Sequence, residues 1–202
     1  MRSVITLQQQ QKEYSTVATD EVLLSAVAVG AGDALGELFV RHHLKVYRFL
    51  TRMAPLDRHH IDDLVQNTFM AASESARRFR GNASVETWLM AIAANILKQH
   101  IHKEARRRSL TGILQKNAPQ SVCDTTPESE VMQHKMMDQL AQGIQQMSHK
   151  LKVVFVMCDL EGIAGTEVAR ILNLREGTVW SRLHDARKQL REVLAAHREG
   201  DQ

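Results

Sequence analysis

The sequence is poor in the residues that build β-sheets, disulfide frameworks and membrane spans. Aromatic residues make up only 4% of its 202 residues, and it has two cysteines and three prolines. No apolar run approaches the roughly 20 residues of a membrane-spanning helix, and alternating β-branched runs are few. Leu, Ala, Gln, Met and Glu are abundant instead, so the composition predicts an all-α protein without membrane insertion.

Patterns of catalytic and metal-binding residues are also missing. Ten histidines are present, but His42/His43 and His59/His60 are adjacent pairs, and neighbouring side chains on a helix diverge by about 100°. The sequence has no HxxxH or CxxC spacing, no P-loop and no nucleophile–base set. We therefore predict no catalytic residue, no metal site, no cofactor and no small-molecule substrate.

The N-terminus and the cysteines bear on the cell compartment. The opening MRSVITLQQQQKEYS lacks the apolar core and small-residue cleavage site of a signal peptide. Cys158 lies in an apolar run and reads as a small buried hydrophobe, whereas Cys123 lies in a polar segment. These features predict a cytoplasmic protein in which Cys123 and Cys158 do not form a disulfide.

Helical periodicity and helix breakers divide the chain into two parts. Apolar residues at helical spacing predict helices over 20–29, 33–53, 58–79 and 85–108, with caps at Thr19 or Asp20, Asp57 and Ser84. Further helices are expected from Pro127 to Met147 and from Ser148 to Leu160. The expected fold class is all-α, with two small helical domains joined by a flexible linker. We place a mobile tail at 1–18, the domains at 19–108 and 127–198, and the linker at 109–126.

The stretch 161–194 has the pattern of two helices joined by a tight turn. Val168, Ala169, Ile171 and Leu172 suit a short first helix, and Gly177 is expected to free the backbone for the turn. A longer second helix repeats apolar residues from Val179 onward and carries polar and basic residues between them. This pattern predicts a DNA-binding helix-turn-helix whose second helix fits the major groove. The alternative is an ordinary helical hairpin with a solvated basic face.

Four sequence strings then resemble one known family. EGIAGTEVARILNLREGTVWSRLHDARKQL resembles the promoter-reading helix-turn-helix of bacterial sigma factors, nearest to the extracytoplasmic-function (ECF) group. Upstream, HIDDLVQNTFM, then RGNAS and TWLMAIAAN, follow the other half of the ECF pattern in order and spacing. The resemblance covers nearly all of 25–195 except the linker. It implies a transcription initiation factor that binds core RNA polymerase and directs it to promoters.

The resemblance also implies partners and binding residues. The partners are core polymerase (its β′ clamp helices and β subunit), promoter DNA and an anti-sigma factor. On the helix from Arg58, a stripe is expected to dock on the clamp helices, although a merely solvated face is the alternative. The expected polymerase-binding residues are Asp62, Asp63, Gln66, Asn67 and Phe69. Asn67 stands where the family usually has Glu, which removes one charge-assisted contact.

The first domain is expected to melt and read the −10 element. Residues 80–84 resemble the loop that receives a flipped base, and the following helix is expected to run along the DNA backbone. The expected −10 residues are Arg80, Asn82, Ser84, Asn95, Lys98, Gln99, His102, Lys103 and Arg106. Trp88 is either a wedge between bases or, at this helical spacing, a core residue. Ala94 stands where the family often has Arg.

The second domain is expected to read the −35 element. The expected −35 residues are Thr166, Arg175, Glu176, Gly177, Thr178, Trp180, Ser181, Arg182 and Asp185. Ala164 and Arg175 replace the usual hydroxyl caps of the two helices, and Trp180 and Asp185 replace common cations. These departures predict an unusual −35 preference or affinity. Two rival functions remain: a stand-alone helix-turn-helix regulator with a sensing first domain, and a sigma-like decoy that binds polymerase without initiating.

Overall fold

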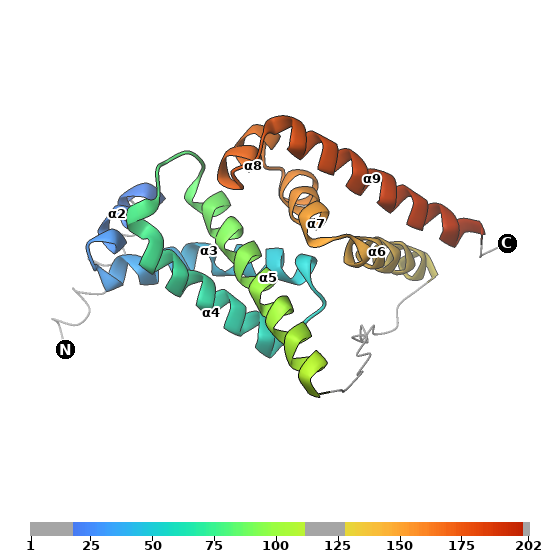
Figure 1. Ribbon diagram of the computed structural model, residues 1–202, viewed down its shortest axis with the longest axis horizontal. Coiled ribbons are helices and arrows are strands. Elements are labelled where there is room, and N and C mark those ends of the chain that lie inside the picture. Colours follow the sequence, from blue (N-terminus) through green and yellow to red (C-terminus); the bar gives the residue numbers. More distant parts are fainter. Residues whose placement is uncertain (1–17, 112–127, 200–202) are drawn as a thin grey trace.

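In the computed structural model, the described residues, 18–111 and 128–199, form helices and contain no strand (Figure 1). This confirms the predicted all-α fold class. The first group contains α2 (Asp20–Ala28), α3 (Gly32–Met53), α4 (Arg58–Ser75), the 3-10 turn Ala76–Arg78, and α5 (Val85–Thr111). The second contains α6 (Glu128–Gln146), α7 (His149–Phe155), the π-helical turn Val156–Leu160, α8 (Gly165–Ile171) and α9 (Glu176–Glu199).

Three predicted caps start helices in the first group. The Thr19 side chain accepts a hydrogen bond from the Val22 amide at 3.4 Å, and Asp57 accepts one from the His60 amide at 2.9 Å. Ser84 Oγ accepts one from the Thr87 amide at 3.1 Å, at the start of α5. Each cap satisfies an amide that has no partner within its helix. In the second group, Ser148 holds the N-cap position of α7 without a side-chain cap bond.

The core of the first group lies between α3, α4 and α5. Phe49, Leu50, Ile61 and Leu97 are completely buried there. Each such side chain gains about 1.5–3 kcal/mol from leaving water. The core of the second group is built around Val154, Met157, Val168, Val179 and Ala186, which are also completely buried. These cores fix α4, α5, α8 and α9, the four helices that carry the predicted binding residues.

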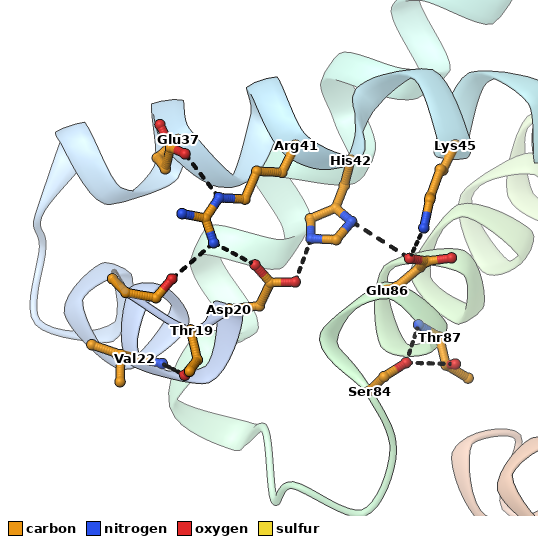
Figure 2. Close-up of polar contacts among 11 residues, drawn as sticks. Thr19, Asp20, Val22, Glu37, Arg41, His42, Lys45, Ser84, Glu86 and Thr87 are labelled. Atoms are coloured by element: carbon orange, nitrogen blue, oxygen red, sulfur yellow. Dashed lines mark hydrogen bonds and ion pairs between the residues drawn. The ribbon is translucent and has the colours of Figure 1, made fainter. Parts of the chain in front are cut away.

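A polar cluster ties α2 to the rest of the first group (Figure 2). Arg41 donates to Asp20 at 3.0 Å, to Glu37 at 2.8 Å and to the Ala18 carbonyl at 2.8 Å. The buried His42 ring lies 2.7 Å from the other Asp20 oxygen. Charged partners and a buried ring make this contact more specific than apolar packing alone. It therefore sets how α2 sits on α3.

Several predicted boundaries need correction. Asn173, with φ 52°, is the left-handed residue of the helix-turn-helix turn, whereas Gly177 lies inside α9. Asparagine tolerates this conformation because its short polar side chain bonds locally. The helix predicted over 58–79 ends as an α-helix at Ser75 and is followed by the 3-10 turn. Gly81, with a positive φ of 67°, lies in the loop beyond it. α5 extends to Thr111, three residues beyond the predicted end at 108 and into the predicted linker.

The predicted tail and the remaining linker residues fall on 1–17 and 112–127, outside the described residues, and so does Cys123. Cys158 is half-buried and free, and burial is the main cause of the raised pKa of its thiol. In the part of the chain that is described, no helix is both long and apolar enough to cross a membrane.

Candidate nucleic-acid interface

The loop before α5 combines backbone freedom with exposed polar groups. Asn82 and Ser84 are exposed, and Gly81 supplies the left-handed turn between them and the 3-10 turn. The Ser84 hydroxyl also donates to Thr87 Oγ1 at 2.8 Å while it caps α5 (Figure 2). Because capping uses this hydroxyl, the base-reading groups of the loop are the exposed side chains of Asn82 and Arg80.

A hollow with a volume of about 220 Å³ opens beside this loop. Three predicted −10 residues line it together, namely Arg80, Asn82 and Asn95. Trp88 lines it as well and packs edge-on against Phe79, with ring centroids 5.3 Å apart. Trp88 is therefore half-buried, with its ring anchored in the domain and partly facing the hollow.

The remaining predicted −10 residues follow one another along α5. Lys98, Gln99, His102, Lys103 and Arg106 are all exposed. The last turns of α5 also carry Arg107, which lies 3.9 Å from the Glu104 carboxylate. An exposed basic face of this kind attracts phosphates and releases counterions on binding. It starts beside the hollow, at Asn95, and continues toward the C-terminal end of α5.

The helix-turn-helix presents its predicted residues on α8 and on the first turns of α9. Thr166, Arg175, Glu176, Gly177, Ser181 and Asp185 are exposed, and Thr178 and Arg182 are half-buried. Trp180 is 52% exposed. Its ring covers Gly165 so closely that a Cβ at that position would lie 3.0 Å from the indole. One face of the indole therefore belongs to the α8–α9 contact, and the rest is free for a ligand.

The predicted docking stripe on α4 is exposed except for one residue. Asp62, Asp63, Gln66 and Asn67 face solvent. Arg58 and His59 lie 3.7 and 3.8 Å from the two carboxylates, but both are highly exposed, and such pairs contribute little. Phe69 is 4% exposed and packs edge-on against Phe39. We therefore correct the expectation for Phe69, which supports the stripe from beneath and is not accessible to a partner.

The sequence reasoning missed four residues that join the two groups. Arg170 of α8 donates to the Asn82 carbonyl at 3.0 Å, and Glu167 accepts from the Ser84 amide at 2.9 Å. Burial opposes ionisation of Glu167, but hydrogen bonds from Ser84 and Thr87 outweigh it and lower the pKa of that carboxyl. Arg52 of α3 forms an ion pair with Glu161. These partners are 83 to 109 residues apart in sequence, so no local pattern pointed to them.

Basic groups also meet where α7 faces α5. Lys152 is 8% exposed, and burial lowers its pKa to about 8. Its ammonium donates to Gln145 Oε1 at 2.8 Å and to the Gln145 carbonyl at 3.3 Å. His149 has a lowered pKa because of burial first, then Lys98, Lys152 and His102. No cluster of three metal-ligating side chains occurs among the described residues.

Comparisons with known proteins agree with this geometry. Residues 38–107 match the model of Sigma-70 region 2, and residues 137–190 match that of Sigma-70, region 4. The chain is 32% identical over 182 residues to an ECF RNA polymerase sigma-E factor of Haemophilus influenzae, covering 87% of this chain and 95% of the relative. It is 28% identical to an ECF RNA polymerase sigma factor SigE of Mycolicibacterium smegmatis, over 89% of this chain and 70% of the relative.

Two solved structures share the fold. CnrH in complex with the cytosolic domain of CnrY has a TM-score of 0.62 at 21% identity, covering 88% of this chain and 97% of that one. The sigma factor RpoE in complex with the anti-sigma factor NepR from Bartonella quintana has a TM-score of 0.61 at 18% identity, with coverage of 79% and 96%. At these identities the likeness concerns the fold. Both family matches, in chain order, and the Haemophilus relative carry the assignment: this chain belongs to the ECF sigma factors of the sigma-70 family.

Proposed function

We propose that this chain binds core RNA polymerase and directs it to specific promoters. The observation that carries the proposal is the pair of sigma-70 matches, region 2 over 38–107 and region 4 over 137–190. Sigma factors are not an enzyme class, so in this proposal the polymerase supplies the chemistry and the protein acts in the cytoplasm. The working units are a region-2-like domain over 19–108 and a region-4-like domain over 127–198.

The polymerase contact is assigned to the exposed stripe on α4. Asp62 and Asp63 supply negative charge, and Gln66 and Asn67 supply hydrogen-bonding groups on the same face. The four side chains lie over a rigid core that includes the buried Phe69. Such a face suits a partner surface that is basic and polar, because complementary charge speeds and orients association.

The −10 contact is assigned to the hollow and to the exposed face of α5. Arg80, Asn82 and Asn95 line a space beside the aromatic ring of Trp88. This combination offers hydrogen bonds to a base edge and an apolar surface for a base taken out of its stack. Ser84 supports the loop as a cap. Phosphates are assigned to the exposed polar and basic side chains of α5, namely Lys98, Gln99, His102, Lys103 and Arg106.

The −35 contact is assigned to the first turns of α9 with the start of α8. Thr178, Ser181 and Arg182 lie on the polar side of α9, and Trp180 presents the free part of its indole. Recognition helices read the major groove with residues from their N-terminal part. Arg175 and Thr166 flank this surface and contact the DNA backbone.

Control by an anti-sigma factor completes the proposal. Two solved structures of similar fold are complexes with a second protein. One is CnrH with the cytosolic domain of CnrY, and the other is the sigma factor RpoE with the anti-sigma factor NepR. A pull-down from the native cell under non-inducing conditions should recover a small stoichiometric partner. Recovery of polymerase alone would count against this part of the proposal.

Run-off transcription with purified core enzyme tests the main proposal. Initiation from a cognate promoter, dependent on this chain, is the expected result. A stand-alone regulator would instead bind duplex DNA tightly without polymerase, and a decoy would bind polymerase without initiating. The same preparation therefore separates all three functions when it is assayed for polymerase binding, duplex binding and transcription.

A further inference from the structure

The first helix of the helix-turn-helix lies directly on the loop assigned to the −10 element. Arg170 donates to the Asn82 carbonyl at 3.0 Å, and Glu167 accepts from the Ser84 amide at 2.9 Å. Figure 1 shows α8 above the N-terminal end of α5, where this loop enters the helix. Arg170 and Ile171 also form one wall of the hollow beside Asn82. A base entering that hollow therefore meets α8.

A second contact joins the two domains at α3. Arg52 near the end of α3 pairs with Glu161, which precedes α8, and the Arg52 carbonyl accepts from Gln145 Nε2 of α6 at 3.2 Å. The Glu161 side chain is only 16% exposed, so this pair is partly sheltered from water. Glu161 holds the start of the 161–171 segment on α3, and Glu167 and Arg170 hold its later part on the loop. Together these contacts fix α8 over the loop.

This arrangement is incompatible with binding both promoter elements at once. The −35 and −10 elements are about 25 base pairs apart, and at about 3.4 Å per base pair this is roughly 85 Å along the DNA axis. In the closed arrangement, the helix-turn-helix and the −10 loop are within hydrogen-bonding distance of each other. The domains must separate before the chain can span a promoter.

We propose that these interdomain contacts are an autoinhibitory latch, in which the helix-turn-helix covers the −10 loop until the domains separate. The proposal rests on the role assigned above to that loop. The latch consists of the Arg52–Glu161 ion pair and two contacts of α8 with the loop. In these contacts Glu167 accepts from the Ser84 amide and Arg170 donates to the Asn82 carbonyl. Polar interdomain contacts of this kind permit relative motion. None of the latch residues belongs to the α4 stripe assigned to polymerase.

Charge reversal of the Arg52–Glu161 pair tests the latch in the full-length chain. Arg52→Glu and Glu161→Arg should each open the molecule, raise the radius of gyration in small-angle X-ray scattering, and tighten binding of a short fluorescent single-stranded DNA several-fold. Arg52→Glu makes the chain more acidic and Glu161→Arg makes it more basic. A general charge effect on DNA binding would therefore move the two variants in opposite directions, whereas opening moves both in the same direction.

The double variant Arg52→Glu/Glu161→Arg restores the pair and should return both measurements to the wild-type values. Lys188→Glu and Glu192→Lys are the matched controls, because these exposed residues of α9 face each other at 4.0 Å and should leave the radius unchanged. Glu167→Ala should open the chain as the single reversals do.

Wild-type radii in both single reversals, or a double variant that stays open, would overturn the latch. If the single reversals open the chain and the double variant closes it again, but DNA binding is the same in all of them, the latch has no inhibitory role. Failure of the proposed function looks different, because then wild type and open variants alike would give no run-off transcript with core enzyme.

Discussion

The indole of Trp180 on the recognition helix covers Gly165 at the start of α8, and a Cβ at Gly165 would lie only 3.0 Å from the ring. Gly165→Ala must therefore push the half-exposed ring outward by a few tenths of an ångström. We expect weaker binding of a −35 duplex with little loss of thermal stability. Gly36→Ala in α3 is the control, because its Cβ meets nothing within 4 Å, and it should stabilise the protein by about 0.5–1 kcal/mol. Equal −35 binding by Gly165→Ala and wild type would remove the indole from recognition.

Charge reversal on the α4 stripe should abolish polymerase binding. In the variant Asp62→Lys/Asp63→Lys, two exposed carboxylates become cations on the proposed docking face, and like charges then oppose the partner. The fold should be intact, because neither side chain is buried. Glu21→Lys/Glu74→Lys carries the same charge change at exposed positions off the stripe and should bind normally. Co-purification with core enzyme is the measurement, and unchanged recovery of the stripe variant would refute the assignment.

Replacement of Asn82 should change promoter preference at one −10 position. The side chain lines the hollow, while its backbone carbonyl is held by Arg170. If the amide bonds a base edge, Asn82→Ala should cost about 1–3 kcal/mol of discrimination at that base. Transcription from a promoter library randomised in the −10 element reports this directly. A uniform loss across all sequences would instead mean that Asn82 shapes the loop without reading a base.

Arg182 lies on the polar side of α9 with Thr178 and Ser181. Arg182→Ala should weaken −35 recognition and spare polymerase binding, which is assigned to α4. If Arg182 holds a phosphate, the loss should be equal across −35 sequences, and the slope of log affinity against log salt should fall by about one. If it reads a guanine, the loss should be confined to one position. Full transcription from a −35-dependent promoter would exclude both roles.

The buried Lys152 should make stability depend on pH. Burial lowers its pKa from 10.5 to about 8, so between these values the unfolded chain binds more protons than the folded one. Stability then rises with pH from about 8 to 10.5. Lys152→Met should remove this rise and stabilise the protein at neutral pH by on the order of 2 kcal/mol. Urea unfolding at several pH values measures both effects, with the exposed Lys150→Met as the control. A wild-type stability that is flat over this range would contradict the prediction.

Local chemistry explains why much of the fold could be predicted. Thr19, Asp57 and Ser84 were identifiable as caps because their side-chain oxygens suit exposed amides at helix starts. The apolar spacing around Val168 and Val179 was enough to indicate the two helices of the helix-turn-helix. Gly177 was a wrong choice for the turn because two residue types tolerate the left-handed conformation, and only the backbone decides that Asn173 adopts it.

The candidate site was less accessible to prediction from sequence. Periodicity placed Asp62 and Asp63 on an exposed face, but it did not distinguish a buried support such as Phe69 from a contact residue. Family resemblance indicated residues 80–84 without showing that the Ser84 hydroxyl is used as a cap. Arg170 and Glu167 meet the loop through tertiary packing alone, so their partners carry no local sequence signal.

The contacts of α8 with the loop fall on main-chain atoms, the carbonyl of Asn82 and the amide of Ser84. Every residue except proline at position 84 offers the same atoms. The loop side chains, and with them the promoter sequences that are recognised, can therefore change while the closed arrangement keeps its hydrogen bonds. Within residues 80–84, promoter choice therefore depends on side chains, whereas the autoinhibitory contacts depend on backbone atoms, so mutations can change the first without changing the second.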